Sequence, residues 1–94
     1  MENTVQKYNM PMIKSVVACE DYRVLVELSN GHAIILDMEC KLNTIRFSML
    51  SNKDIFKKVY TDGFSVLWQH GVVRLNFAEI IQMLQRSVLL SVVA

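Results

Sequence analysis

Residues that interrupt regular structure are scarce in this chain, which has one proline and three glycines among 94 residues. Its two cysteines are fewer than the disulfide framework of a small secreted domain requires. Long apolar runs are missing as well, because the most apolar segment, 88–94, has about a third of the length of a membrane-spanning helix. The first residues lack the apolar stretch of a signal peptide. We therefore expect a cytoplasmic protein that does not enter a membrane.

Apolar residues, in contrast, make up 52% of the chain, and charged residues make up 20%. This composition excludes disordered and collagen-like chains, because so much apolar surface collapses around a core. The length allows one domain. We expect a flexible N-terminal segment over 1–12 and a single α+β domain over 13–94.

The net charge of +1 conceals an uneven distribution. Segment 1–40 has three basic and six acidic residues, 41–58 has five basic and one acidic, and the remainder is balanced. The two zones either neutralise each other on a solvated surface, or the basic zone contacts an acidic partner. The candidate basic contact surface consists of Lys41, Arg46, Lys53, Lys57 and Lys58.

Turn signals in the first half predict three antiparallel strands over 13–38. Asn30 and Gly31 are typical of a two-residue type I′ turn, since both of its central positions need positive φ. That turn places Val26 opposite Ile35. The apolar face is then predicted to hold Val24, Val26, Leu28, Ala33 and Ile35.

Two further turns predict a three-stranded meander over 58–77, one at Asp62-Gly63 and one at His70-Gly71. The second turn pairs Val66 with Leu75 and Trp68 with Val73. The inner face is predicted to carry Val59, Thr61, Phe64, Val66, Trp68, Val73, Leu75 and Phe77. The outer face, which includes Tyr60, is predicted to be largely polar.

Two helices are expected, a short one near Lys53–Lys57 between the sheets and an amphipathic one at the C-terminal end, packed on the sheet. Asn76 can cap the second helix, and Glu79 three positions later completes an approximate capping box. Its core-facing stripe consists of Phe77, Ile80, Ile81, Leu84 and Val88.

The C-terminal tail loses this amphipathic pattern, and its branched residues favour a strand. Exposed, such a segment would pair with another chain's edge. It therefore either returns to its own sheet or pairs across a homodimer, and we favour the dimer. The candidate oligomer or partner interface consists of Val88, Leu89, Leu90, Val92 and Val93.

Motifs for catalysis are absent, and we expect no enzymatic activity. The glycines lie singly in turns, and no nucleophile elbow or His-Glu-x-x-His pair occurs. The spacing of Cys19, His32, Cys40 and His70 matches no zinc pattern, so neither a metal nor another cofactor is indicated.

The order of several short motifs resembles the small bacterial domains of unknown function 2442 (DUF2442). The resemblance covers 13–85 and lies in Val16-Val17-Ala18, Tyr22-Arg23-Val24-Leu25-Val26, Asn30-Gly31, Ile35-Leu36-Asp37, Ile55-Phe56-Lys57-Lys58-Val59 and Ser65-Val66-Leu67-Trp68-Gln69-His70-Gly71. Two departures are Arg74, where these domains usually have an acidic residue, and Asn76-Phe77-Ala78-Glu79 in place of their usual helix entry. The resemblance implies a sheet-rich α+β fold without assigned activity, in a family some of whose members are fused to DNA-binding segments and many of which are encoded beside another small protein.

Two functional hypotheses follow. The first is a non-enzymatic protein-interaction module, an antitoxin-like member of a pair with a small neighbouring protein. The second is a nucleic-acid-binding or transcription-regulatory accessory domain that uses the basic segment 41–58. Salt discriminates between them, because phosphate contacts weaken steeply with salt and an apolar interface does not.

Overall fold

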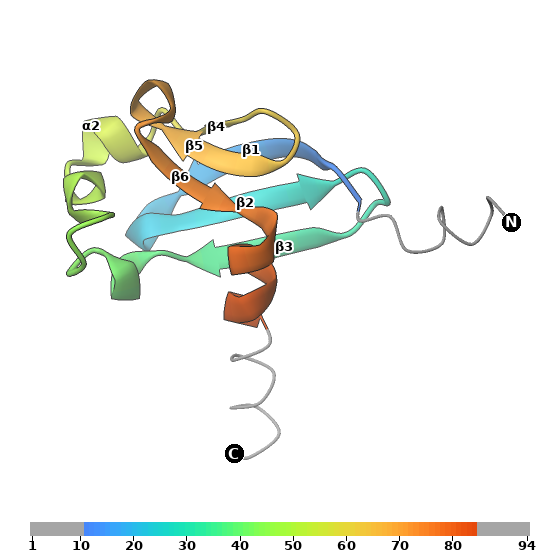
Figure 1. The fold of residues 1–94 in the computed structure, drawn as a ribbon, viewed down its shortest axis with the longest axis horizontal. Helices are drawn as coiled ribbons and strands as arrows, with labels where there is room; N and C mark the ends of the chain where they lie inside the picture. Colours follow the sequence, from blue (N-terminus) through green and yellow to red (C-terminus); the bar gives the residue numbers. More distant parts are fainter. Residues whose placement is uncertain (1–10, 85–94) are drawn as a thin grey trace, which may run out of the picture.

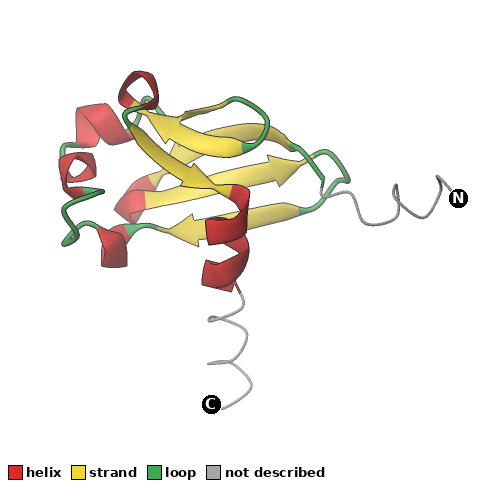
Figure 2. Cartoon of the chain, in the orientation of Figure 1, coloured by secondary structure: helices red, strands yellow, loops and turns green. Residues whose placement is uncertain are grey.

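The computed structural model describes residues 11–84, which form two three-stranded antiparallel sheets and a C-terminal helix, an α+β fold (Figures 1 and 2). The first sheet has the order β1 (Ile13–Cys19), β2 (Arg23–Leu28), β3 (Ala33–Asp37). The second has the order β4 (Tyr60–Thr61), β5 (Ser65–Trp68), β6 (Val73–Asn76). Short 3-10 turns and the helix α2 (Lys53–Phe56) connect the sheets, and the C-terminal helix occupies 77–84 of the described residues.

The core lies between the two sheets. Figure 1 shows the second sheet in front of the first, with the C-terminal helix crossing β3. The backbone N–H of Ile13 donates to the carbonyl of Gly63 at 2.9 Å and joins the sheets beside β1. The largest side chains buried in this layer are Trp68, Leu36, Met38, Leu50, Leu75, Ile80, Val24, Val26, Val66 and Val73.

The predicted register of the first hairpin is wrong by one residue. Val26 pairs with Ile34 rather than Ile35, because the loop has three residues instead of two. The N–H of Leu28 donates to the carbonyl of His32, and the N–H of Gly31 donates to the carbonyl of Leu28. Within the loop, only Gly31 is left-handed, with a φ of 92°. Asn30 keeps a negative φ, as in a turn followed by a glycine bulge.

This one-residue shift reverses the faces of β3, because side chains alternate along a strand. Ala33 and Ile35, both predicted in the core, are exposed, and Ile35 is 65% exposed. Leu36 takes the buried position opposite Val24, and Ile34 the partly buried position opposite Val26.

In the second sheet, the β5–β6 hairpin has the predicted register. Val66 pairs with Leu75 and Trp68 with Val73. His70 and Gly71 both have positive φ, and the N–H of Val72 donates to the carbonyl of Gln69 at 3.0 Å. His70 is therefore a turn residue, as predicted.

The β4–β5 connection is longer than predicted. Thr61 pairs with Val66 rather than Phe64, so four residues instead of two separate the paired positions. The Asp62 carboxylate stabilises it by accepting hydrogen bonds from the N–H groups of Phe64 and Ser65, each at 2.9 Å. Phe64 is consequently 64% exposed instead of buried.

The outer face of β5 is also less polar and less open than predicted. Ser65 and Leu67 are both buried there, although Tyr60 beside them is exposed as expected. Tyr60 and Arg74 flank Leu67 on the neighbouring strands, because both pair with it. Long side chains on either side of a central strand shield it from water.

Three aromatic rings connect the two sheets through α2. Phe56 packs edge-on against Tyr22 at 5.2 Å between centroids and is stacked with Trp68 at 6.1 Å. The indole N–H of Trp68 donates to the carbonyl of Phe56, and the hydroxyl of Tyr22 donates to the carbonyl of Ser51 at 2.6 Å. We call these three residues the aromatic column.

Both helices lie where the sequence predicts them. The side chain of Asn52 accepts from the N–H of Asp54 and caps α2. At the C-terminal helix, Asn76 and Glu79 each accept from the other's N–H, at 2.9 and 3.0 Å, and complete the predicted capping box. Ile80 is fully buried in the core.

The left-handed Gly31 in the loop of the first hairpin leads to a prediction about stability. A Cβ on Gly31 would meet nothing within 4 Å, so the cost of Gly31→Ala is purely conformational. We expect Gly31→Ala to lower the free energy of unfolding by about 1–2 kcal/mol in urea titrations. Gly31→Asn should cost less, because asparagine tolerates the left-handed region. Equal stability of Gly31→Ala and the native chain would contradict the left-handed conformation of Gly31.

Candidate functional site

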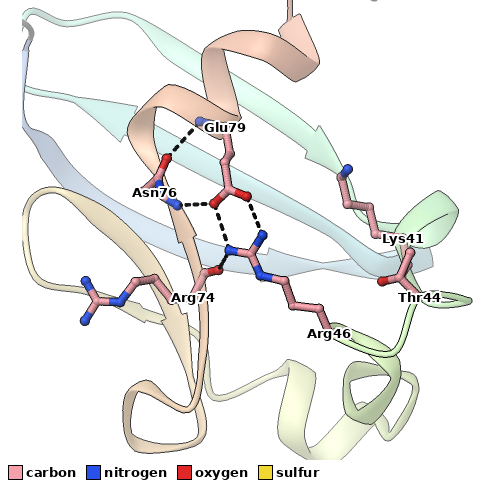
Figure 3. A network of polar contacts seen from close by, with 6 residues as sticks. All are labelled: Lys41, Thr44, Arg46, Arg74, Asn76 and Glu79. Atoms are coloured by element: carbon pink, nitrogen blue, oxygen red, sulfur yellow. Dashed lines mark hydrogen bonds and ion pairs between the residues drawn. The ribbon is translucent and has the colours of Figure 1, made fainter.

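Arg46, one of the predicted basic contact residues, is held inside a polar network (Figure 3). Its guanidinium donates to both carboxylate oxygens of Glu79, one of them at 2.8 Å, and to the carbonyl of Arg74. Glu79 also belongs to the capping box with Asn76. Arg46 therefore attaches the middle segment to β6 and to the start of the C-terminal helix.

This network shifts the ionisation of both partners. The hydrogen bonds from Arg46 hold the pKa of the Glu79 carboxyl below its ordinary value, and Lys41 adds to the effect from a greater distance. The same contact raises the pKa of Arg46. Both groups are therefore charged at neutral pH and satisfy each other, which is a structural arrangement.

Of the other predicted basic residues, the structure brings two together at one depression. Lys53 and Lys57 lie on and just after α2, at an open depression of about 600 Å³. Three carboxylates from Glu20, Asp21 and Glu39 line the same depression. Lys41 lies near Glu79, and Lys58 is exposed. Residues of the acidic zone thus share a depression with Lys53 and Lys57, whereas Arg46 pairs with Glu79, which lies outside that zone.

An exposed apolar row crosses the outer face of the first sheet. Val17 pairs with Leu25, and Leu25 pairs with Ile35, so the three side chains lie side by side across β1, β2 and β3. Val17 is 52% exposed and Leu25 is partly buried, while Ile35 projects still further. Because their inward neighbours fill the core, these three residues are available to another molecule. We call them the apolar row.

Polar side chains border the apolar row on both sides. Glu27 lies at one end of β2 and accepts a hydrogen bond from the hydroxyl of Ser15 at 2.8 Å, and Arg23 lies at the other end. The outer face of the first sheet then consists of Ser15, Glu27, Ala33, Val17, Leu25, Ile35, Cys19, Arg23 and Asp37. An apolar centre with a charged rim is the general composition of a protein–protein contact.

The sequence interpretation missed the apolar row because of the hairpin register. With a two-residue loop, Ile35 is assigned to the core, and Leu25 lies on the outer face with Ile34 and Leu36, mixed with polar residues. A signal was present in Leu36, since a large apolar residue would have to be exposed in that register. The predicted interface of Val88, Leu89, Leu90, Val92 and Val93 lies outside the described residues, as does most of the segment 1–12.

Within 11–84, no group of three or more His, Cys, Asp or Glu side chains is placed to hold a metal ion. In the same part of the chain, no helix is both long and apolar enough to span a membrane. Cys19 and Cys40 are free thiols. The chain matches no protein-family model, no curated protein and no solved structure. Function therefore has to be inferred from the surface of the molecule.

The Arg46–Glu79 contact makes a pH-dependent prediction. Glu79→Gln keeps an acceptor for the capping box but removes the charge, so we expect it to cost about 0.5–1 kcal/mol at neutral pH. Glu79→Ala also loses the cap and should cost about 1–2 kcal/mol. Urea titrations of each variant would measure these differences.

The pH dependence of this stabilisation follows from the lowered pKa of Glu79. Its stabilisation is complete above the ordinary glutamate value of 4.5 and is lost as pH falls through the lower pKa of the folded state. The stability gap between the native chain and Glu79→Gln should therefore narrow as the pH falls below that value. A gap independent of pH would show that the charge of Glu79 contributes nothing.

Proposed function

We propose that this chain is a non-enzymatic protein-interaction module and that it binds a protein partner through the outer face of its first sheet. The observation that carries the proposal is the apolar row of Val17, Leu25 and Ile35 at the centre of that face. Single exposed apolar residues are ordinary in soluble proteins, but a contiguous row on a flat sheet is a feature of interaction sites.

The apolar row contributes part of the binding energy, and the rim contributes selectivity. Burying the exposed parts of the three apolar side chains contributes a few kcal/mol, roughly half of the value for full burial of three such residues. Arg23, Glu27 and Asp37 on the rim add charges that select the partner and its orientation. We expect the partner to present a complementary apolar strip bordered by charges of both signs.

The resemblance to the DUF2442 domains belongs to the same proposal. Many of those domains are encoded beside another small protein, and we propose that such a neighbour is the partner, with this chain as the antitoxin-like member of the pair. We place this interaction in the cytoplasm, in keeping with the two free thiols.

Nucleic-acid binding through segment 41–58 is the alternative. The engagement of Arg46 by Glu79, together with the carboxylates beside Lys53 and Lys57, weighs against it. These contacts reduce the net positive potential that binding to phosphates needs.

Co-expression with the product of the adjacent gene tests the proposal with two matched variants. Ile35→Glu places a charge in the apolar row, and Ile45→Glu makes the same change at a residue that is 96% exposed in the middle segment. We expect Ile35→Glu to lower the affinity of the complex at least about tenfold, since an unpaired charge would be desolvated. Ile45→Glu should bind like the native chain.

Titration calorimetry at two salt concentrations completes the test. Binding through the apolar row should change little with salt. Equal affinities of the Ile35→Glu and Ile45→Glu variants would contradict the proposed face. Association with DNA or RNA that weakens steeply with salt and is lost in Lys53→Glu would support the alternative instead.

A further inference from the structure

We infer that the outer face of the first sheet binds a second copy of this chain, face to face, about a two-fold axis that runs along the apolar row. The inference rests on the proposed function, since it concerns the same face, and it makes a second copy and the product of the adjacent gene competitors for that face. It differs from the tail-mediated dimer that the sequence suggests, because every residue involved lies between Ser15 and Asp37.

The order of side chains along β2 is the basis for this inference. Arg23 and Glu27 each lie two positions from Leu25, on opposite sides, and all three belong to the outer face. A half-turn about the line through Val17, Leu25 and Ile35 places a second β2 antiparallel over the first. Leu25 then meets Leu25 of the second copy, and Arg23 meets Glu27.

The contact between Arg23 and Glu27 occurs twice, as a two-fold interface requires. Arg23 of each copy faces Glu27 of the other, so two ion pairs border the apolar row on opposite sides. The remaining rim residues also oppose compatible groups, since Asp37 faces Ala33 and Cys19 faces Ser15. No like charges oppose each other in this arrangement of the nine face residues.

The charges also exclude the other simple face-to-face arrangement. A half-turn about an axis parallel to β2 would place Arg23 over Arg23 and Glu27 over Glu27. Like charges in direct opposition cost several kcal/mol. The apolar row alone is compatible with both axes, so Arg23 and Glu27 determine which of the two forms.

The available area sets the strength of the contact. Three strands spaced about 4.8 Å apart, each with about 3.3 Å per residue, give a flat footprint of roughly 14 by 20 Å. Two such faces together cover roughly 560 Å², which is below the range of stable specific complexes and typical of weak, transient ones. We therefore expect a reversible dimer with a dissociation constant in the micromolar range.

Sedimentation equilibrium of the full chain over a concentration series tests this directly, with charge-reversal variants. Arg23→Glu places two carboxylates opposite each other on both sides of the row, and Glu27→Arg does the same with two cations. We expect each variant alone to self-associate at least about tenfold more weakly than the native chain. An equimolar mixture of the two should form a heterodimer, because all its opposing rim charges are then of opposite sign.

The results of these experiments decide whether a second copy of the chain occupies the outer face of the first sheet. Recovery of dimer in the mixture supports the inference, and Ile45→Glu, which lies off the face, should dimerise like the native chain. A native chain that stays monomeric at hundreds of micromolar overturns the inference. The inference is also overturned if the dimer persists in the Arg23→Glu and Ile35→Glu variants but is lost on truncation after Ser87.

The same variants separate this inference from the proposed function. If the native chain is monomeric and the Ile35→Glu variant no longer binds the product of the adjacent gene, the face binds that protein rather than a second copy. Only the inference then fails. If Ile35→Glu affects neither self-association nor that complex, both fail together.

Discussion

The stacking of Trp68 on Phe56 holds the two halves of this fold together. Trp68 belongs to the second sheet and Phe56 to α2, and Tyr22 continues the aromatic column to the first sheet. Aromatic side chains bury large areas, and such pairs contribute about 0.5–1.5 kcal/mol beyond that burial. The hydrogen bond from the Trp68 indole to the Phe56 carbonyl satisfies the one polar atom of the ring. The sheets keep their face-to-face arrangement because this column fixes α2 beside both of them.

This arrangement explains why the functional surface lies where it does. The second sheet and the C-terminal helix cover one side of the first sheet only, so its inner residues complete the core while the outer ones stay accessible. Arg46 is less free to bind a partner, because Glu79 and the carbonyl of Arg74 accept hydrogen bonds from both of its terminal nitrogens. The most basic segment of the sequence therefore contributes largely to folding, and an apolar row that the composition conceals provides the exposed surface.

Local chemistry made much of the fold predictable. The His70-Gly71 turn, the Asn76–Glu79 capping box and the short helix near Lys53 depend on interactions within a few residues, and the structure shows each of them. The errors arose where two local solutions compete. Asn30-Gly31 suits both a two-residue and a three-residue loop, and the choice depends on which face of β3 the second sheet covers. The apolar row could not be found until that tertiary contact fixed the register.

The turn between β1 and β2 has a consequence for cooperativity. Asp21 and Tyr22 are both left-handed, with φ of 61° and 58°, which costs on the order of 1–2 kcal/mol for each residue. The contacts of Tyr22 with Phe56 and Ser51 offset that cost only when α2 is in place. An isolated β1–β2 hairpin would therefore relax its turn, and loss of α2 would release the strain in the first sheet. Hairpin and helix should consequently open and close as one unit, protecting their amide protons from exchange together.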